Sequence, residues 1–162
     1  MATKTSKRVG ETSTTVSVGV RIDPKVKFAL DIMGRLQKRS LTAVIEWAIS
    51  NAISQQAIDK STYSMGELLD KIWSTDESTR LVMLAFYLPQ ALTYDELRLW
   101  ETIQASGYFW HKYPDGTYDE NNLDMLDFSA VRSGWSSLTD HVEKYKGNSC
   151  IMPIYERQIV PF

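Results

Sequence analysis

The first regular pattern along the chain is an alternation of apolar residues with other residues. Every second position from 16 to 22 holds valine or isoleucine, namely Val16, Val18, Val20 and Ile22. The positions between them hold Ser17, Gly19 and Arg21. A repeat of two residues places successive side chains on opposite faces of an extended strand. The pattern therefore predicts a strand over 16–22, with the valines and the isoleucine on its buried face.

Two helices are predicted directly after this strand. Asp23 is a favoured N-cap and Pro24 suits the first helical position, where its missing N–H costs nothing, so a helix is expected over 24–37. Ser40 is a second N-cap, and it predicts a helix over 41–54. The second helix carries a broad apolar stripe made of Ala43, Val44, Trp47, Ala48 and Ala52. The first helix is too small to cover this stripe, so a further surface is required.

Helix start signals continue after a polar segment at 54–63, where a domain boundary is expected. Ser64 and Thr93 are each followed three residues later by glutamate, which is the capping-box pattern at a helix start. They predict helices over 65–73 and from 94 to about 104. Asp76 starts another helix, which Pro89 ends.

The remaining sequence is less regular. The aromatic segment 108–113 fits either a longer helix or a hairpin that turns at 114–116. Short helices are expected at 123–131 and 138–145, followed by an extended tail at 151–162. The expected fold is mainly α, with an arm at 1–13, a strand and two helices in 14–57, and a mostly helical domain in 64–162.

Charge is distributed unevenly between the two parts. Residues 1–60 hold ten basic and five acidic side chains, a net charge of +5, whereas residues 61–162 hold eight basic and fifteen acidic ones, a net charge of −7. Positive charge on a small domain favours a partner with a regularly charged backbone, such as nucleic acid.

The N-terminal part is too small to close a core by itself. One strand and two helices span about forty residues, a size at which a staple or a second subunit is normally needed. The single cysteine, Cys150, rules out an internal disulfide. Dimerisation is therefore expected, with a core made of Val16, Val18, Val20, Ile22, Val44, Trp47 and Ala48.

The order of these signals resembles a known family. A strand that ends in Arg21 is followed by Asp23 and Pro24, then by a helix, and Lys38-Arg39-Ser40 opens an apolar second helix. Over residues 14–54 this arrangement resembles the ribbon-helix-helix family of repressors and antitoxins. The resemblance implies a homodimer, or a higher oligomer built from it, in which two strands pair antiparallel and enter the major groove of double-stranded DNA.

The outer face of the strand supplies the residues expected to read bases, which are Ser17, Gly19 and Arg21. The forked guanidinium of Arg21 can donate twice to a guanine. Gly19 departs from the family's usual polar residue and offers no side-chain contact, so part of the recognition is expected to depend on DNA shape.

Backbone contacts are expected at the start of the second helix. Its unpaired amides and positive dipole end favour a phosphate, and two basic side chains flank it. The expected phosphate-binding residues are Lys38, Arg39, Ser40, Leu41 and Thr42. Lys4, Lys7 and Arg8 in the arm are candidates for further DNA contacts or, equally, for a solvated tail.

The second half contains no recognisable catalytic pattern. His111, His141 and Cys150 do not have the spacing of a zinc site, and no phosphate loop or nucleophile elbow is present. We therefore expect no enzyme activity, no metal and no cofactor. No apolar run reaches the ~18 residues of a membrane span, and residues 1–15 lack the apolar segment of a secretion signal, so a cytoplasmic protein is expected.

Several functions remain open at this point. A transcriptional regulator, with repression as its expected mode, ranks first. The alternatives are an antitoxin that controls its own promoter, a plasmid or phage protein that organises DNA for partition or transfer, and a scaffold that only dimerises. The dense aromatic group at 108–113 is expected to be either core or a surface for a partner or effector.

Overall fold

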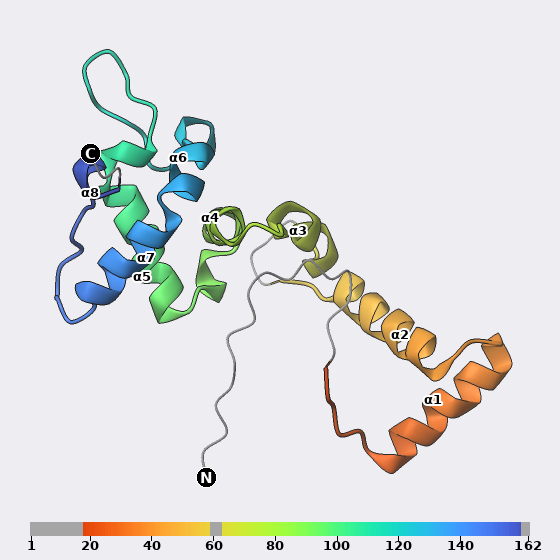
Figure 1. The fold of residues 1–162 in the computed structure, drawn as a ribbon. Helices are drawn as coiled ribbons and strands as arrows, with labels where there is room; N and C mark the ends of the chain where they lie inside the picture. The colour runs from red at the N-terminus through yellow and green to blue at the C-terminus, as the bar shows by residue number, and fades with distance from the viewer. Residues whose placement is uncertain (1–17, 59–62, 160–162) are drawn as a thin grey trace, which may run out of the picture. The chain divides into compact units, whose positions relative to one another are not determined.

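The computed structural model describes residues 18–58 and 63–159, and this part of the chain is mainly helical (Figure 1). In these ranges backbone pairing between extended segments is limited to two isolated antiparallel bridges, Ala57 with Ser64 and Trp110 with Leu126. The α-helices are α1 (Pro24–Gln37), α2 (Leu41–Gln55), α3 (Met65–Ile72), α4 (Glu77–Tyr87), α5 (Tyr94–Ala105), α6 (Phe128–Ser133), α7 (Trp135–Lys144) and α8 (Glu156–Ile159). Three 3-10 turns complete them: η1 (Pro89–Ala91), η2 (Gly107–Phe109) and η3 (Leu123–Met125).

The chain divides into two compact units, residues 1–67 and residues 68–162. The division falls inside α3, a few residues after the polar segment at which the sequence predicts it.

The N-terminal unit is built on α1 and α2, and both begin as predicted. The Asp23 carboxylate accepts hydrogen bonds from the amides of Lys25 (2.8 Å) and Val26 (3.4 Å). The Ser40 hydroxyl accepts one from the amide of Ala43 at 3.2 Å. The predicted span of α1 is confirmed, and α2 is one residue longer than predicted.

The turn between α1 and α2 is tight. Lys38 adopts a left-handed conformation with a φ of 54°, and the amide of Arg39 donates to the Gly34 carbonyl at 3.0 Å. A Cβ on Gly34 would lie 3.1 Å from the Arg39 carbonyl oxygen and 3.8 Å from Val44 Cγ2. Glycine therefore allows the turn to fold back closely on α1, and Val44 to lie against it.

The predicted strand is not formed by residues 18–22, which are the part of it that the structure describes. Residues 18–22 form neither helix nor strand and pair with no other described segment, and Val16 and Ser17 lie outside the described residues. A ribbon of the expected kind needs a second strand, and the described chain supplies no such partner. What the structure establishes is the coarser prediction, a mainly helical protein.

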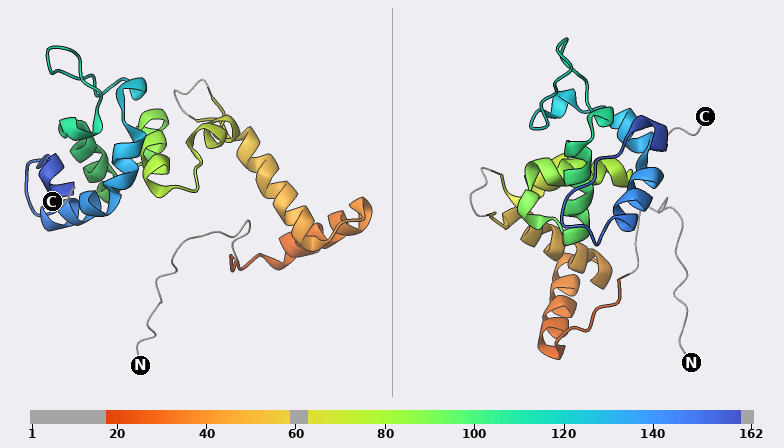
Figure 2. Two further views of the ribbon diagram at one scale, coloured as in Figure 1. Left: turned by 45° about the horizontal axis from the view of Figure 1, so that its top comes forward. Right: turned by 90° about the vertical axis from the view of Figure 1, so that its left-hand side faces the viewer.

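The C-terminal unit has its own hydrophobic core. In it α5 packs between α4 and α7, and α6 contacts both α4 and α7 (Figure 2). The buried side chains of this core include Val82, Ile103, Phe109, Val131, Leu138 and Ile154. Trp110 is also buried, with its indole N–H donating to the Ile103 carbonyl at 2.8 Å and its ring stacked on Tyr118 at 5.8 Å.

A loop from 111 to 122 leaves this core and returns to it. Two backbone hydrogen bonds close its base. The amide of His111 donates to the Met125 carbonyl (2.7 Å), and the amide of Asp127 donates to the Phe109 carbonyl (2.8 Å). At its tip the Asp115 carboxylate accepts from the amide and hydroxyl of Thr117, and Gly116 has a φ of 85°. Of the two predicted alternatives, the hairpin turn at 114–116 is therefore the one observed, although no strands flank it.

Two predictions in this unit are wrong. The single helix expected at 123–131 is broken into η3 and α6, because Leu126 pairs with Trp110 and the Asp127 carboxylate starts α6 by accepting from Ser129 (2.9 Å). The tail expected to be extended from 151 forms the short helix α8 after Tyr155, whose amide donates to the Gln158 side chain at 2.9 Å.

Candidate nucleic-acid interface

The turn from α1 to α2 borders an open hollow of about 380 Å³ with a basic lining. Its lining residues are Leu30, Asp31, Gly34, Arg35, Lys38, Arg39 and Leu41. The only acid among them, Asp31, already binds Lys27 through a 2.7 Å contact between Lys27 Nζ and Asp31 Oδ2. The other charged residues of the hollow are Arg35, Lys38 and Arg39. None of these three cations has a carboxylate of a described residue within 4.0 Å.

The start of α2 presents backbone donors beside these cations. The amide of Ala43 is bound by the Ser40 hydroxyl, and that of Val44 by the Ser40 carbonyl at 3.1 Å. The amides of Leu41 and Thr42 precede the first intrahelical hydrogen bond, so they remain available for another acceptor. This is the arrangement that holds a phosphate at a helix N-terminus.

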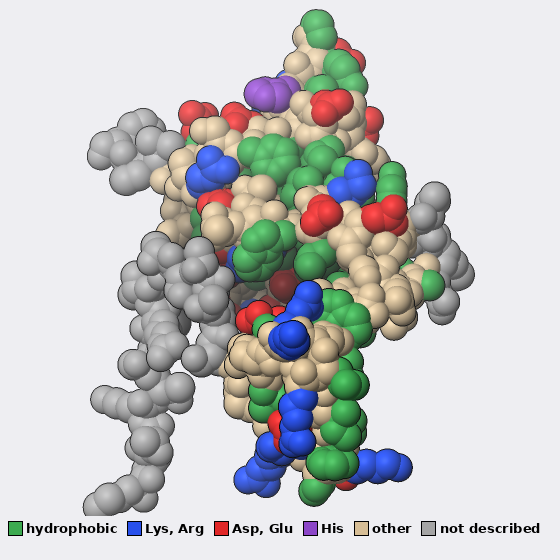
Figure 3. All heavy atoms as spheres, turned by 90° about the vertical axis from the view of Figure 1, so that its right-hand side faces the viewer, with side chains coloured by type: hydrophobic (Ala, Val, Ile, Leu, Met, Phe, Trp, Pro, Cys, Tyr) green, Lys and Arg blue, Asp and Glu red, His purple; other side chains and the backbone are tan. Residues whose placement is uncertain are grey.

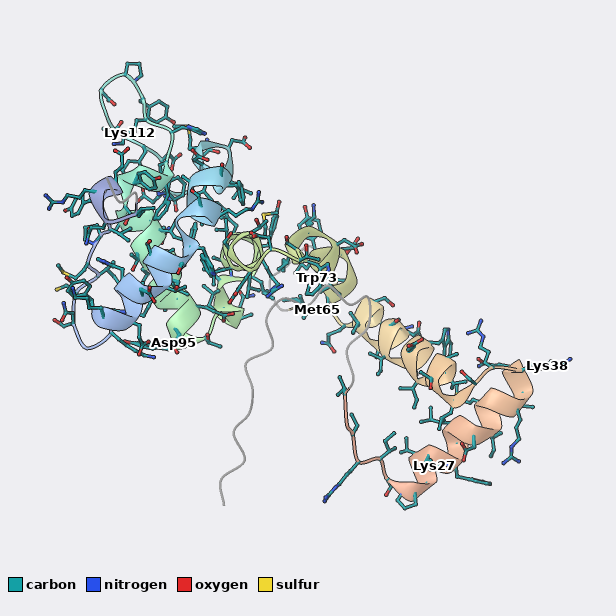
Figure 4. All side chains as sticks on the ribbon, viewed as in Figure 1. Lys27, Lys38, Met65, Trp73, Asp95 and Lys112 are labelled. Atoms are coloured by element: carbon teal, nitrogen blue, oxygen red, sulfur yellow. The ribbon has the colours of Figure 1, made fainter. Side chains whose placement is uncertain are left out.

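The described basic side chains of this unit lie along α1 and the turn that follows it. Blue Lys and Arg side chains are spread over the lower part of the space-filling view in Figure 3, with green apolar side chains next to them. Lys38 projects from the turn in Figure 4, and Lys27 lies toward the other end of α1.

The predicted base-reading residues lie in the exposed segment before α1. Arg21 and Gly19 are both exposed, and Arg21 makes no ion pair or hydrogen bond with the described residues. Ser17 and the arm residues Lys4, Lys7 and Arg8 lie outside the described residues.

The residues predicted to form a dimer core differ in their burial. Val44 is fully buried by the packing of α2 on α1 within one chain. Val18 and Val20, in contrast, are 76% and 70% exposed, Ile22 and Trp47 are also exposed, and Ala48 is half-buried. The exposed set is large for so small a unit, and it comprises Val18, Val20, Ile22, Val26, Phe28, Ile32, Leu36, Leu41, Trp47 and Ile49.

The aromatic group at 108–113 is divided between core and surface. Phe109 and Trp110 are buried, Tyr108 is half-buried, and Tyr113 is exposed on the loop. Acidic residues that could suggest chemistry have structural partners instead, since Asp115 closes the loop tip and Asp127 caps α6.

The candidate metal ligands lie in separate surroundings. The imidazole Nε2 of His141 is 2.8 Å from the Met152 carbonyl oxygen, whereas His111 and Cys150 are exposed. Within residues 18–58 and 63–159, no three His, Cys, Asp or Glu side chains gather closely enough to hold a metal ion.

One hollow was missed by reasoning from the sequence. It lies in the C-terminal unit and is lined by residues from 107–112 and 155–157. No local pattern predicts it, because its two walls are separated by more than forty positions in the chain.

Every helix that the structure describes is too short or too polar to span a bilayer. Comparison with protein-family models, with curated proteins and with solved structures gives no match.

Proposed function

We propose that this protein is a sequence-specific DNA-binding transcriptional regulator that acts as a ribbon-helix-helix dimer and represses by occupying its operator. The observation that carries the proposal is the exposed apolar surface of residues 18–49, which accompanies a basic helix start. Among residues 18–49, ten large apolar side chains are exposed and Val44 alone is buried, so this part of the chain has not completed a core.

A second copy completes this core in the proposed dimer. Two segments containing residues 16–22 pair antiparallel, and Val18, Val20 and Ile22 turn toward the helices of both chains. Because side chains alternate along a strand, Gly19 and Arg21 then face outward. The pairing also accounts for the lack of a strand over residues 18–22 of a single chain.

In the proposed dimer, DNA binding depends on the residues that face outward from the ribbon and on the start of α2. The ribbon enters the major groove, where Arg21 can donate two hydrogen bonds to the O6 and N7 atoms of a guanine. Lys38, Arg39 and the amides of Leu41 and Thr42 hold a phosphate on each side. The phosphates fix the position of the dimer on the duplex, whereas Arg21 supplies sequence preference.

The compact C-terminal unit favours a regulator over an antitoxin. Antitoxins of this family commonly carry a short disordered tail, whereas residues 68–159 here form a unit with a core of its own. A regulator can use such a unit to bind an effector or a protein partner.

The proposal is tested by selecting DNA from a random pool with the full-length protein. We expect the enriched fragments to share two copies of a short motif, arranged as a palindrome or a direct repeat. Sequencing of the fragments after several rounds shows whether such a motif exists. A pool that stays random, or binding that does not weaken as salt rises, would exclude sequence-specific DNA binding.

A further inference from the structure

The C-terminal unit contains a hollow of about 500 Å³ with an aromatic and basic lining. It lies where η2 and the first residues of the loop meet α8. Its lining consists of Gly107, Tyr108, Lys112, Tyr155, Glu156 and Arg157. This volume falls in the range of small-molecule sites, which are about 300–1,000 Å³.

Both walls of the hollow are anchored in the core. One wall continues into Phe109, which is fully buried and whose carbonyl accepts from the amide of Asp127. The other wall continues from Ile154, which is buried and whose amide donates to the Ser106 hydroxyl at 2.9 Å. Each wall is therefore next in sequence to a residue that is fixed in the core.

Gly107 allows Lys112 to lie close to the backbone of η2. A Cβ at position 107 would come within 3.1 Å of the Tyr118 ring and 3.4 Å of Lys112 Cε. Because glycine has no Cβ, there is room for the aliphatic part of Lys112 at the base of the loop. Lys112 is labelled in Figure 4.

The two cations of the hollow are not paired with acids. Among the described residues, Lys112 and Arg157 have no carboxylate within 4.0 Å, although Lys27, Arg132 and Lys146 each do. The Arg157 guanidinium instead lies 5.9 Å from the centre of the Tyr155 ring. Glu156 is the only acid in the lining, so cations outnumber acids there by two to one.

We infer that this hollow binds a small anionic molecule that carries an aromatic ring. Its carboxylate or phosphate group binds Lys112 and Arg157, and its ring packs against Tyr108 and Tyr155. Aromatic rings and cations together suit such a ligand, because the rings bind the apolar body and the cations fix the orientation of the charged end. The inference concerns the C-terminal unit alone and stands independently of DNA binding.

Phenyl phosphate is the probe for the test, with inorganic phosphate and phenol as its two separate halves. Titration of the full-length protein is followed by calorimetry and by the backbone amide signals of an NMR spectrum. We expect phenyl phosphate to shift the Gly107 amide and to bind at least about tenfold more tightly than either half. The Gly34 amide reports separately on the basic hollow of the N-terminal unit.

Two variants and a matched control locate the site. Lys112→Ala and Arg157→Ala should each weaken binding of phenyl phosphate about ten- to a hundredfold, as expected when one hydrogen bond to a charged group is removed. Lys144→Ala is the control, because Lys144 also lies over a tyrosine ring, Tyr145, at 5.3 Å but outside the hollow. All three side chains are exposed, so the fold should not change.

Three results would each overturn the inference. The first is a Gly107 amide that does not move up to the highest soluble phenyl phosphate concentration. The second is undiminished affinity when Lys112 and Arg157 are both replaced by alanine. The third is inorganic phosphate binding as tightly as phenyl phosphate, which would show that the ring contributes nothing.

Discussion

Asp76 and Arg132 join the start of α4 to α6, with 3.5 Å between Asp76 Oδ2 and Arg132 Nε. Burial of the Asp76 carboxyl would by itself raise its pKa. Hydrogen bonds from the Ser78 hydroxyl and from the hydroxyl and amide of Thr79, together with the charge of Arg132, outweigh this effect and lower the pKa from 3.8 to about 2. Asp76 therefore stabilises the C-terminal unit in its ionised form.

Asp76→Ala should destabilise the C-terminal unit by about 1–2 kcal/mol at neutral pH, the usual cost of losing a helix cap. Because the folded-state pKa lies below the unfolded value, this contribution is present above pH 4 and is lost as the pH falls toward 2. Urea unfolding at pH 7, 4 and 2 checks the prediction, since the wild type and the variant should converge at the lowest pH.

Asp140→Ala is the matched control, because Asp140 is an exposed acid on α7. It should leave the urea midpoint unchanged at each pH. A constant difference between Asp76→Ala and the wild type from pH 7 to pH 2 would contradict the role assigned to the ionised carboxylate.

Two adjacent substitutions test the proposed ribbon. Val20→Lys should convert the dimer into a monomer, because Val20 faces the partner's helices in the dimer, whereas Gly19→Lys should leave the dimer intact. Light scattering gives the mass, which should be twice the 18.5 kDa of one chain for the wild type and for Gly19→Lys. In a single chain both positions are exposed, so equal behaviour of the two variants would rule out the alternating face.

The helix boundaries of the N-terminal unit could be predicted because their signals are local. Asp23 with Pro24, and Ser40, start α1 and α2 through hydrogen bonds that span no more than three residues. The ribbon strand is a different case, since a strand needs a partner, and no pattern within one chain can supply it.

The break before α6 has a tertiary cause. It depends on Leu126, which pairs with Trp110 sixteen residues earlier, and α6 then starts at Asp127. The hollow beside α8 is lined by residues from 107–112 and 155–157, and no local sequence pattern shows that these two segments meet.

Arg21→Ala should reduce preference for the selected DNA motif far more than it reduces binding to unrelated DNA. Removing a side chain that donates two hydrogen bonds to guanine costs about 1–3 kcal/mol of discrimination, which is roughly a five- to hundredfold decrease in affinity for the motif. Competition binding against a scrambled duplex measures both affinities. Equal decreases on the two duplexes would show that Arg21 binds only the DNA backbone.

Lys38 and Arg39 should act differently from Arg21, because phosphates carry no sequence information. Replacing both by alanine should weaken binding to the selected motif and to unrelated DNA alike, and flatten the plot of log affinity against log salt by roughly 0.9 for each phosphate that the protein no longer neutralises. Affinity measured from about 50 to 200 mM salt tests this. Lys144→Ala, a cation of the C-terminal unit, is the control and should keep the original slope. Because Lys38 and Arg39 stand beside the free amides of Leu41 and Thr42, an unchanged slope in their double variant would mean that the start of α2 does not hold a phosphate.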